Sequence, residues 1–170
     1  MNEKQTIIKN GRFILFYGKI GEGKTLAAVK LVKELAEKGN KVFTNIKLNE
    51  IKSLPFHKRN FLRYKDKVIF LDMIDFSLLV TSRQYTKFTN PDRIDKFFSN
   101  NNTLIVTMQD PQYLCPALKF RLNNAFECYM NRSRNILVLD SIRNKKYIIR
   151  DKEAYFRFYN TMEMPNWKKN

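Results

Sequence analysis

The spacing of hydrophobic and polar positions changes along the chain, and each change marks a predicted element. Residues 13–17 form a short apolar and aromatic run, which predicts a buried strand. Residues 25–38 have helical periodicity and strong helix formers, and Gly39 follows in a position that ends many helices. The start of the chain therefore predicts a strand, a glycine-containing link and a helix.

The rest of the chain alternates between strand-like and helix-like segments and then turns to strands alone. Apolar runs predict strands at residues 41–46, 68–72, 103–109, 126–130, 136–139 and 147–149. Helical patterns lie around residues 92–98 and over 111–123, and Pro116 interrupts or restarts the second. Residues 47–67 are basic and irregular, and residues 143–146 are predicted to form a hairpin turn.

Strands that alternate with helices favour a parallel sheet covered on both faces. The predicted fold class is therefore α/β, a three-layer sandwich with a mostly parallel central sheet. The late strands are expected to extend this sheet as an antiparallel edge. No repeat or linker divides the sequence, so residues 1–170 are predicted to form a single domain.

The link between the first strand and helix, residues 18–25 (here called the phosphate loop), fits the pattern G-x-x-x-x-G-K-[ST]. Its glycines allow backbone N–H groups to converge on phosphate oxygens, and the helix N-terminus adds favourable partial charge. We expect Lys24 to reach the β- and γ-phosphates and the Thr25 hydroxyl to ligate Mg²⁺. The strand and helix on either side argue against a chance glycine-rich turn. The predicted nucleotide contacts are Gly18, Lys19, Ile20, Gly21, Glu22, Gly23, Lys24, Thr25 and Leu26.

A second anchor for the metal is expected at the end of another buried strand. Asp72 follows the apolar run 68–71, which would raise it toward the edge of the sheet where ligands of open α/β folds bind. An ordinary N-cap of a following helix is the alternative role for this aspartate. Because a phosphate loop requires such a partner, we predict that Asp72 and Thr25 are the metal ligands.

The residue that would activate the attacking water differs from the usual pattern. ATPases usually place a glutamate directly after this aspartate, but the chain has Met73, whose thioether cannot act as a base. Asp75 is the first candidate replacement, and Glu22 of the phosphate loop is another. Slow hydrolysis, or hydrolysis completed by a neighbouring subunit, is a third alternative. Gln109 ends the next strand and can orient water or sense the γ-phosphate, unless it is only a surface amide.

The charge of the chain points to a polyanionic partner. Lys and Arg total 32 against 16 Asp and Glu, a formal charge of +16, which favours nucleic acid unless it is only a solvated surface. The sequence has no apolar run near the ~20 residues of a membrane span and no signal peptide. Cys115 and Cys128 lack C-x-x-C spacing, so we expect reduced thiols and a cytoplasmic location. His57, the single histidine, is predicted to lie on the surface.

The order of these motifs resembles the HerA/FtsK superfamily of DNA-pumping ATPases. In size the chain is most similar to the minimal genome-packaging ATPases of small double-stranded DNA viruses. The resemblance covers roughly residues 11 to 163. It rests on the phosphate loop, residues 42–46, the run ending in Asp72, Ser82–Arg83, Thr107–Gln109, Leu118–Leu122 and Tyr155–Glu163.

The resemblance implies an enzyme that uses ATP and Mg²⁺ to translocate double-stranded DNA, as in packaging a viral genome into a capsid. It also implies a homo-oligomeric ring, commonly a hexamer, with nucleotide between subunits and a capsid vertex protein as a partner. An arginine from the neighbouring subunit, Arg121 or Arg83, would stabilise charge on the γ-phosphate. Such a motor would work in the host cytoplasm or with the virion. Met73 and the absence of a basic pair in residues 97–102 depart from the family pattern.

Three other functions stay open. The Thr44–Ile46 element and the spacing from Asp72 to Arg83 also resemble Zot-like assembly ATPases of filamentous phages, which usually carry a membrane span. A catalytically weak nucleotide-binding switch is consistent with Met73. A small-molecule kinase would need a lid with several arginines, which the sequence does not show.

Overall fold

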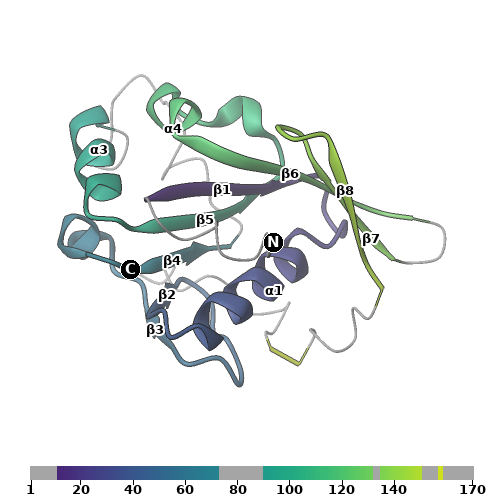
Figure 1. Ribbon diagram of the computed structural model, residues 1–170, viewed down its shortest axis with the longest axis horizontal. Helices are drawn as coiled ribbons and strands as arrows, with labels where there is room; N and C mark the ends of the chain where they lie inside the picture. The colour runs from purple at the N-terminus through teal and green to yellow at the C-terminus, as the bar shows by residue number, and fades with distance from the viewer. Residues whose placement is uncertain (1–10, 73–89, 132–134, 151–156, 159–170) are drawn as a thin grey trace, which may run out of the picture.

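The computed structural model describes residues 11–72, 90–131, 135–150 and 157–158. Its centre is an eight-stranded sheet with the order β3-β2-β4-β5-β1-β6-β7-β8. Helix α1 covers one face, and α3 and α4 lie on the other (Figure 1). The strands are β1 (Arg12–Tyr17), β2 (Val42–Thr44), β3 (Ser53–Pro55), β4 (Val68–Leu71), β5 (Thr103–Met108), β6 (Leu122–Met130), β7 (Ile136–Asp140) and β8 (Lys145–Ile149). The α-helices are α1 (Lys24–Glu37), α3 (Pro91–Ser99) and α4 (Pro116–Phe120), with 3-10 turns at Lys58–Arg63 and Pro111–Tyr113.

The central strand β1 shows why both faces of the sheet need a cover. Phe13 and Leu15 are fully buried among side chains from α3 and α4. Ile14 and Phe16 are buried against α1 on the opposite face. A strand with four successive buried apolar residues, 13–16, requires helices on both sides, as parallel α/β sheets provide. The predicted three-layer α/β architecture is confirmed.

The helix that follows the phosphate loop forms where the sequence predicts it. Helix α1 buries an apolar stripe against the sheet, and the stripe includes Leu26, Val29, Val32 and Leu35. Each such side chain contributes about 1.5–3 kcal/mol on full burial. The helix ends just before Gly39, whose φ of 86° is the left-handed conformation that glycine adopts readily. This stripe fixes the start of α1, and with it the phosphate loop, over the sheet.

The parallel part of the sheet gathers strand ends at one edge. Tyr17 of β1 lies beside Met108 of β5 and Glu127 of β6, and Leu71 of β4 lies beside Val106. All of these strands run in the same direction, so their carboxyl ends meet at one edge, here called the carboxyl edge. The opposite edge, where the same strands begin, is called the amino edge. Ligands of open α/β sheets bind at the carboxyl edge.

Two sequence-based expectations are wrong in the region after β5. The helix expected over residues 111–123 is a 3-10 turn followed by the short α4, which begins at Pro116. β6 then starts at Leu122, earlier than expected, because it pairs with β1. The Asn123 side chain accepts a hydrogen bond from the Phe13 backbone N–H at 2.8 Å, where the register shifts. This long-range pairing outweighs local helix propensity.

β6 is also not an antiparallel edge strand. It runs parallel to β1, and only β7 and β8 add in antiparallel fashion beyond it. The hairpin turn lies at residues 141–144, slightly before its expected position. The irregular basic stretch contains two elements that the pattern did not predict: the short β3, which pairs with β2, and the 3-10 turn Lys58–Arg63. Among the described residues, no helix is both long enough and apolar enough to cross a membrane.

Candidate nucleotide site

The phosphate loop connects β1 to α1 at the carboxyl edge, and its glycines are required by close packing as well as by conformation. Gly18 has φ 141°, and a side-chain Cβ there would lie 2.3 Å from the carbonyl oxygen of Cys128. Gly23 has φ 81°, and a Cβ there would lie 2.4 Å from Cδ1 of Ile136 in β7. Both distances are far too short for carbon. The loop is therefore pressed against β6 and β7, and only glycine fits at these two positions.

Lys24, the lysine of the phosphate loop, is held across the loop that precedes it. Its side chain is buried, and its Nζ donates a hydrogen bond to the carbonyl oxygen of Lys19 at 2.7 Å. Burial lowers the pKa of Lys24, and the nearby carboxylates of Asp72 and Glu22 act in the opposite direction. The ammonium group is thus kept in place at the point where the loop would receive phosphate oxygens.

Asp72 is the centre of a buried hydrogen-bonded group at the carboxyl edge. Its Oδ1 accepts a hydrogen bond from the Thr25 hydroxyl at 2.7 Å and another from the Thr107 hydroxyl at 2.6 Å. These residues come from three elements: the end of β4, the first turn of α1 and β5. The predicted neighbours Thr25 and Asp72 are therefore in direct contact.

The donor set at Asp72 and Thr25 suits a hard cation. Adjacent ligands of an octahedral Mg²⁺ with 2.0–2.1 Å bonds lie about 2.9 Å apart. The 2.7 Å between Thr25 Oγ1 and Asp72 Oδ1 is close to that spacing. Carboxylate and hydroxyl oxygens are also the ligand types that Mg²⁺ prefers. In the part of the chain that the structure describes, no group of three or more His, Cys, Asp and Glu forms a metal cluster.

Asn45, which directly follows β2, positions Asp72 through the backbone. Its Nδ2 donates to the carbonyl oxygen of Asp72 at 2.9 Å, and its Oδ1 accepts from the backbone N–H of Asp72 at 2.8 Å. Asn45 is 3% exposed and Asp72 is 7% exposed, so water does not compete for these bonds. The sequence singled out Asn45 and Thr107 only as parts of short motifs. A polar residue in or directly after a buried strand, the same signal as for Asp72, marks both as candidates but does not show that they contact Asp72.

Gln109 also lies beside the phosphate loop. Its backbone carbonyl accepts a hydrogen bond from the Gly18 N–H at 3.3 Å, and its side chain is exposed. Together with Lys19 and Glu22 it lines a hollow of about 650 Å³ at the carboxyl edge. Cys128 lines the same hollow; burial raises the pKa of its thiol to about 12, so the group stays protonated at neutral pH. Cys115 and Cys128 are both free thiols, and His57 is exposed.

Of the remaining predicted site residues, Arg121 is the one that the structure describes, and it lies apart from this group. Arg121 directly precedes β6 at the amino edge, and its guanidinium pairs with Asp95 of α3 at 2.7 Å. It is therefore remote from the phosphate loop of its own chain. Asp75, Met73 and Arg83 lie outside the described residues, as does most of residues 155–163.

The sheet order, the glycine loop and its buried partner aspartate together define the fold of P-loop NTPases, as the sequence predicted. No family model and no curated protein matches the chain. Solved structures do. The N-terminal domain of zonular occludens toxin from Neisseria meningitidis has a TM-score of 0.62 and 18% identity, over 89% of this chain and 100% of that chain.

Viral packaging enzymes are similar at the level of the fold. B204, the DNA-packaging ATPase from Sulfolobus turreted icosahedral virus, has a TM-score of 0.58 and 10% identity, over 84% of this chain and 98% of that chain. The genome-packaging NTPase B204 from Sulfolobus turreted icosahedral virus 2, in complex with ATP-gammaS, has a TM-score of 0.57 at 10% identity, with the same coverage. The fold likeness that the sequence predicted, to packaging ATPases and to Zot, is confirmed.

Proposed function

We propose that the protein is an ATPase that translocates double-stranded DNA, in the manner of a viral genome-packaging motor. The observation that carries this proposal is the contact between the phosphate loop and Asp72 at the carboxyl edge. Lys24 is held across the phosphate loop, and Thr25 already contacts Asp72 at 2.7 Å. Such a site is suited to bind ATP and to place Mg²⁺ between Thr25 and Asp72.

In this proposal each described residue has a defined role. Backbone N–H groups of the phosphate loop and Lys24 bind the phosphates. Thr25 and Asp72 would hold Mg²⁺, which would supply neutralisation of the charge that develops on the phosphates. Asn45 and Thr107 hold Asp72 in place through the bonds described above. Gln109, at the border of the hollow, orients the attacking water or senses the γ-phosphate.

The base that activates water is proposed to be Asp75, since Met73 cannot serve. Replacing Asp75 with Asn should then reduce turnover far more than ATP affinity. Steady-state hydrolysis and fluorescent-nucleotide titration on the same preparations measure the two quantities. Equal turnover in wild type and Asp75→Asn would remove this role from Asp75 and leave Glu22 or a neighbouring subunit as candidates.

Arg121 is proposed to act on the nucleotide of a neighbouring subunit in a ring, with a hexamer favoured. It is remote from its own phosphate loop, and its side chain is 46% exposed although paired with Asp95. Exposed ion pairs contribute little, so the guanidinium can exchange Asp95 for a phosphate. Arg83 is the alternative arginine.

A mixing experiment tests the action of Arg121 between subunits. Two mixtures are prepared first, one of wild-type with Arg121→Gln subunits and one of wild-type with Lys24→Ala subunits. Turnover should fall in each. Combining the two variants should restore part of the activity, because some interfaces regain both groups. No recovery in the combined sample would contradict action between subunits. Lys119→Gln, a charge change at a neighbouring exposed position, is the matched control.

Double-stranded DNA is proposed as the polymer that the ring moves, because the chain carries a formal charge of +16. Contacts to the phosphate backbone release counterions, so affinity should fall steeply with salt and depend little on base sequence. A capsid vertex protein is the proposed partner during packaging, in the host cytoplasm.

The test is ATP hydrolysis with and without double-stranded DNA, together with the mass of the assembly. We expect stimulation by DNA and loss of turnover in Lys24→Ala. ATP binding without turnover under every DNA and oligomer condition would instead support a nucleotide-binding switch. Phosphoryl transfer to a metabolite would indicate a kinase.

A Zot-like phage assembly ATPase is the second candidate. The likeness to the zonular occludens toxin domain, at 18% identity over 89% of the chain, favours it. Nucleotide-dependent association with membranes, without stimulation by DNA, would support this function over DNA translocation.

A further inference from the structure

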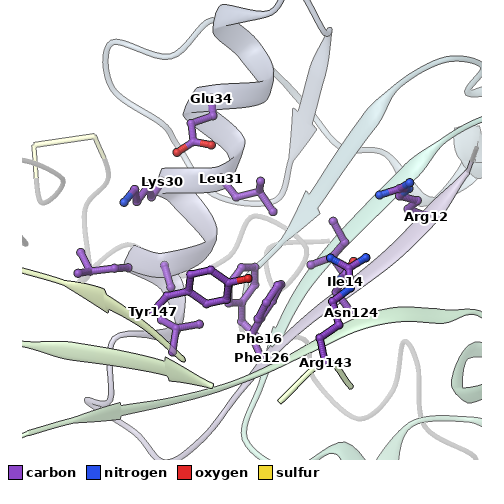
Figure 2. Close-up of a pocket in the computed structure, with 13 residues that line it drawn as sticks. Arg12, Ile14, Phe16, Lys30, Leu31, Glu34, Asn124, Phe126, Arg143 and Tyr147 are labelled. Carbon is purple, nitrogen blue, oxygen red and sulfur yellow. The ribbon is translucent and has the colours of Figure 1, made fainter. Parts of the chain in front are cut away.

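A separate cavity of about 250 Å³ lies between α1 and the strands β1, β6, β7 and β8 (Figure 2). None of its lining residues belongs to the phosphate loop. It opens on the same face of the sheet as α1, and α1 contributes Ala27, Lys30, Leu31 and Glu34 to its wall. The proposed function uses none of these side chains, so it does not explain why the cavity is present.

One side of the cavity is aromatic. The rings of Phe16 and Phe126 stack with centroids 5.0 Å apart and an angle of 26° between their planes. Tyr147 meets Phe126 edge to face, with centroids 6.4 Å apart. Apolar residues such as Val138 complete this part of the lining. Such a surface favours a flat apolar group over a flexible polar one.

The other end of the cavity is polar and cationic. Figure 2 shows Arg12, Asn124 and Arg143 together near Ile14. Asn124 is 6% exposed, and no described residue makes a hydrogen bond with its side-chain amide. Burial lowers the pKa of Arg12, and the positive charge of Arg143 lowers it further. An anionic group at this end would be attracted by both guanidinium groups and could accept a hydrogen bond from the amide.

The position of Arg143 is set by the turn that carries it. Asp140 is fully buried, and its Oδ1 accepts hydrogen bonds from the backbone N–H groups of Ile142 at 3.1 Å and Arg143 at 3.0 Å. The hydroxyls of Tyr17 and Ser141 lie 2.7 Å apart and tie the same turn to β1. The backbone that carries Arg143 is thus held by the fold before any ligand arrives, which reduces the entropy cost of binding.

We propose that this cavity is a binding site for a small organic anion with a flat apolar body, such as an aromatic carboxylate, sulfonate or phosphate ester. The ring lies against Phe16, Phe126 and Tyr147. The anionic group is bound by Arg12, Arg143 and the amide of Asn124. Lys30 and Glu34 of α1 also line the cavity, and their opposite charges cancel, so Arg12 and Arg143 give the lining its net positive charge.

The probe for this site is 8-anilinonaphthalene-1-sulfonate, whose fluorescence rises in apolar surroundings. Its matched neutral probe is N-phenyl-1-naphthylamine, which has the same ring system without the sulfonate. We expect the anionic probe to bind at one saturable site and about tenfold more tightly than the neutral one. Equal affinity for the two probes would show that the cationic end takes no part, which contradicts the proposal.

Variants locate the binding. Arg143→Gln, at an exposed turn position, should weaken the anionic probe about tenfold, whereas Arg59→Gln, the same change at an exposed position outside the cavity, should leave it within twofold. Ala27→Phe fills the cavity and should abolish binding. Thermal melting confirms that each variant folds. If Ala27→Phe fails to fold, the probe affinities of Arg143→Gln and Asn124→Leu test the proposal instead. Wild-type affinity in Arg143→Gln and Asn124→Leu would overturn the proposal.

The nucleotide site must be separated from this one, because aromatic anions also enter nucleotide sites. Titrations are therefore repeated with Lys24→Ala and with excess ATP-gammaS. The proposal expects the probe affinity to stay within twofold in both. Full displacement by ATP-gammaS together with loss of binding in Lys24→Ala would place the probe at the phosphate loop and overturn the proposal. A protein without ATPase activity that keeps this probe site would leave the inference standing.

Discussion

Two polar groups lie at opposite edges of the same sheet, and they are built in opposite ways. At the carboxyl edge, Asp72 is 7% exposed and Asn45 is 3% exposed, and the two are joined by paired hydrogen bonds. At the amino edge, Arg121 and Asp95 form a single ion pair with side chains 46% and 55% exposed. The first group is completed inside one chain. The second leaves an exposed cation that can exchange its partner.

The difference indicates which functions depend on one chain alone and which depend on contacts with another chain. Buried polar groups with all partners present are rigid, and losing one partner costs the desolvation of the other. Exposed ion pairs contribute about 0–1 kcal/mol and lose even that in salt. Nucleotide binding is therefore expected to depend on residues of one chain, and any role of Arg121 on contacts with another.

The largest expected effect is on turnover in Lys24→Met. The change removes a cation held at the phosphate loop, so we expect hydrolysis to fall about 100-fold or more. Lys38→Met, at the exposed C-terminal end of α1, removes the same charge and should leave turnover within twofold. A coupled assay of phosphate release measures both. Similar losses in the two variants would show that total charge matters rather than the carboxyl-edge site.

Asn45→Ala should be the most destabilising change in the comparison. It removes both hydrogen bonds that the Asn45 side chain makes to the backbone of buried Asp72, which costs about 2 kcal/mol or more. Asn49→Ala, which removes an exposed side-chain bond of 3.2 Å to the Arg157 carbonyl, should cost less than about 1 kcal/mol. Urea unfolding of the two variants gives the difference. Equal costs would mean that water reaches Asp72 in the folded protein.

Asp95→Ala tests the amino edge and should change the free energy of unfolding by no more than about 1 kcal/mol. The pair is exposed, so water replaces each lost bond. The small difference should shrink further in 0.5 M NaCl, because salt screens exposed charges. Denaturant melts at low and high salt provide the measurement. A loss comparable to that of Asn45→Ala would show that the two edges are not built differently.

The smallest expected effect is the contribution of Lys24 to the pH dependence of the free energy of unfolding. Burial lowers its pKa in the folded state below the ordinary 10.5, so the unfolded chain binds more protons between the two values. Stability of the wild type relative to Lys24→Met should therefore rise as pH increases toward 10.5. Thermal midpoints of both proteins at pH 7.5 and pH 10 test the sign. A relative fall at pH 10 would mean that the ammonium is stabilised by its surroundings.

The parts of the site that the sequence predicted depend on local order. The phosphate loop is contiguous, and Asp72 follows an apolar run, so strand and helix periodicity were sufficient to identify both. Asn45 was not identified as a site residue, because its role depends on β2 lying beside β4 in the folded sheet. That adjacency is a tertiary fact without a local signal.

The same limit explains the errors in the fold. Residues 122–123 have no strong preference of their own, and they join β6 because β1 offers an unpaired strand edge and the Phe13 N–H to satisfy. The direction of β6 likewise depends on the connection through α4. The spacing of apolar residues does not predict the path of that connection. Fold class and layer order, in contrast, follow from burial patterns that each strand carries in its own sequence.

The contact between Gly23 and Ile136 has a consequence for how the protein is made. The phosphate loop is synthesised before β7, on which it rests, because β7 comes far later in the sequence. At usual rates of translation the interval is on the order of ten seconds. A nascent chain therefore carries the whole nucleotide-binding motif before it has the surface that supports it. ATP affinity should be acquired only after β7 has been synthesised and has joined the sheet.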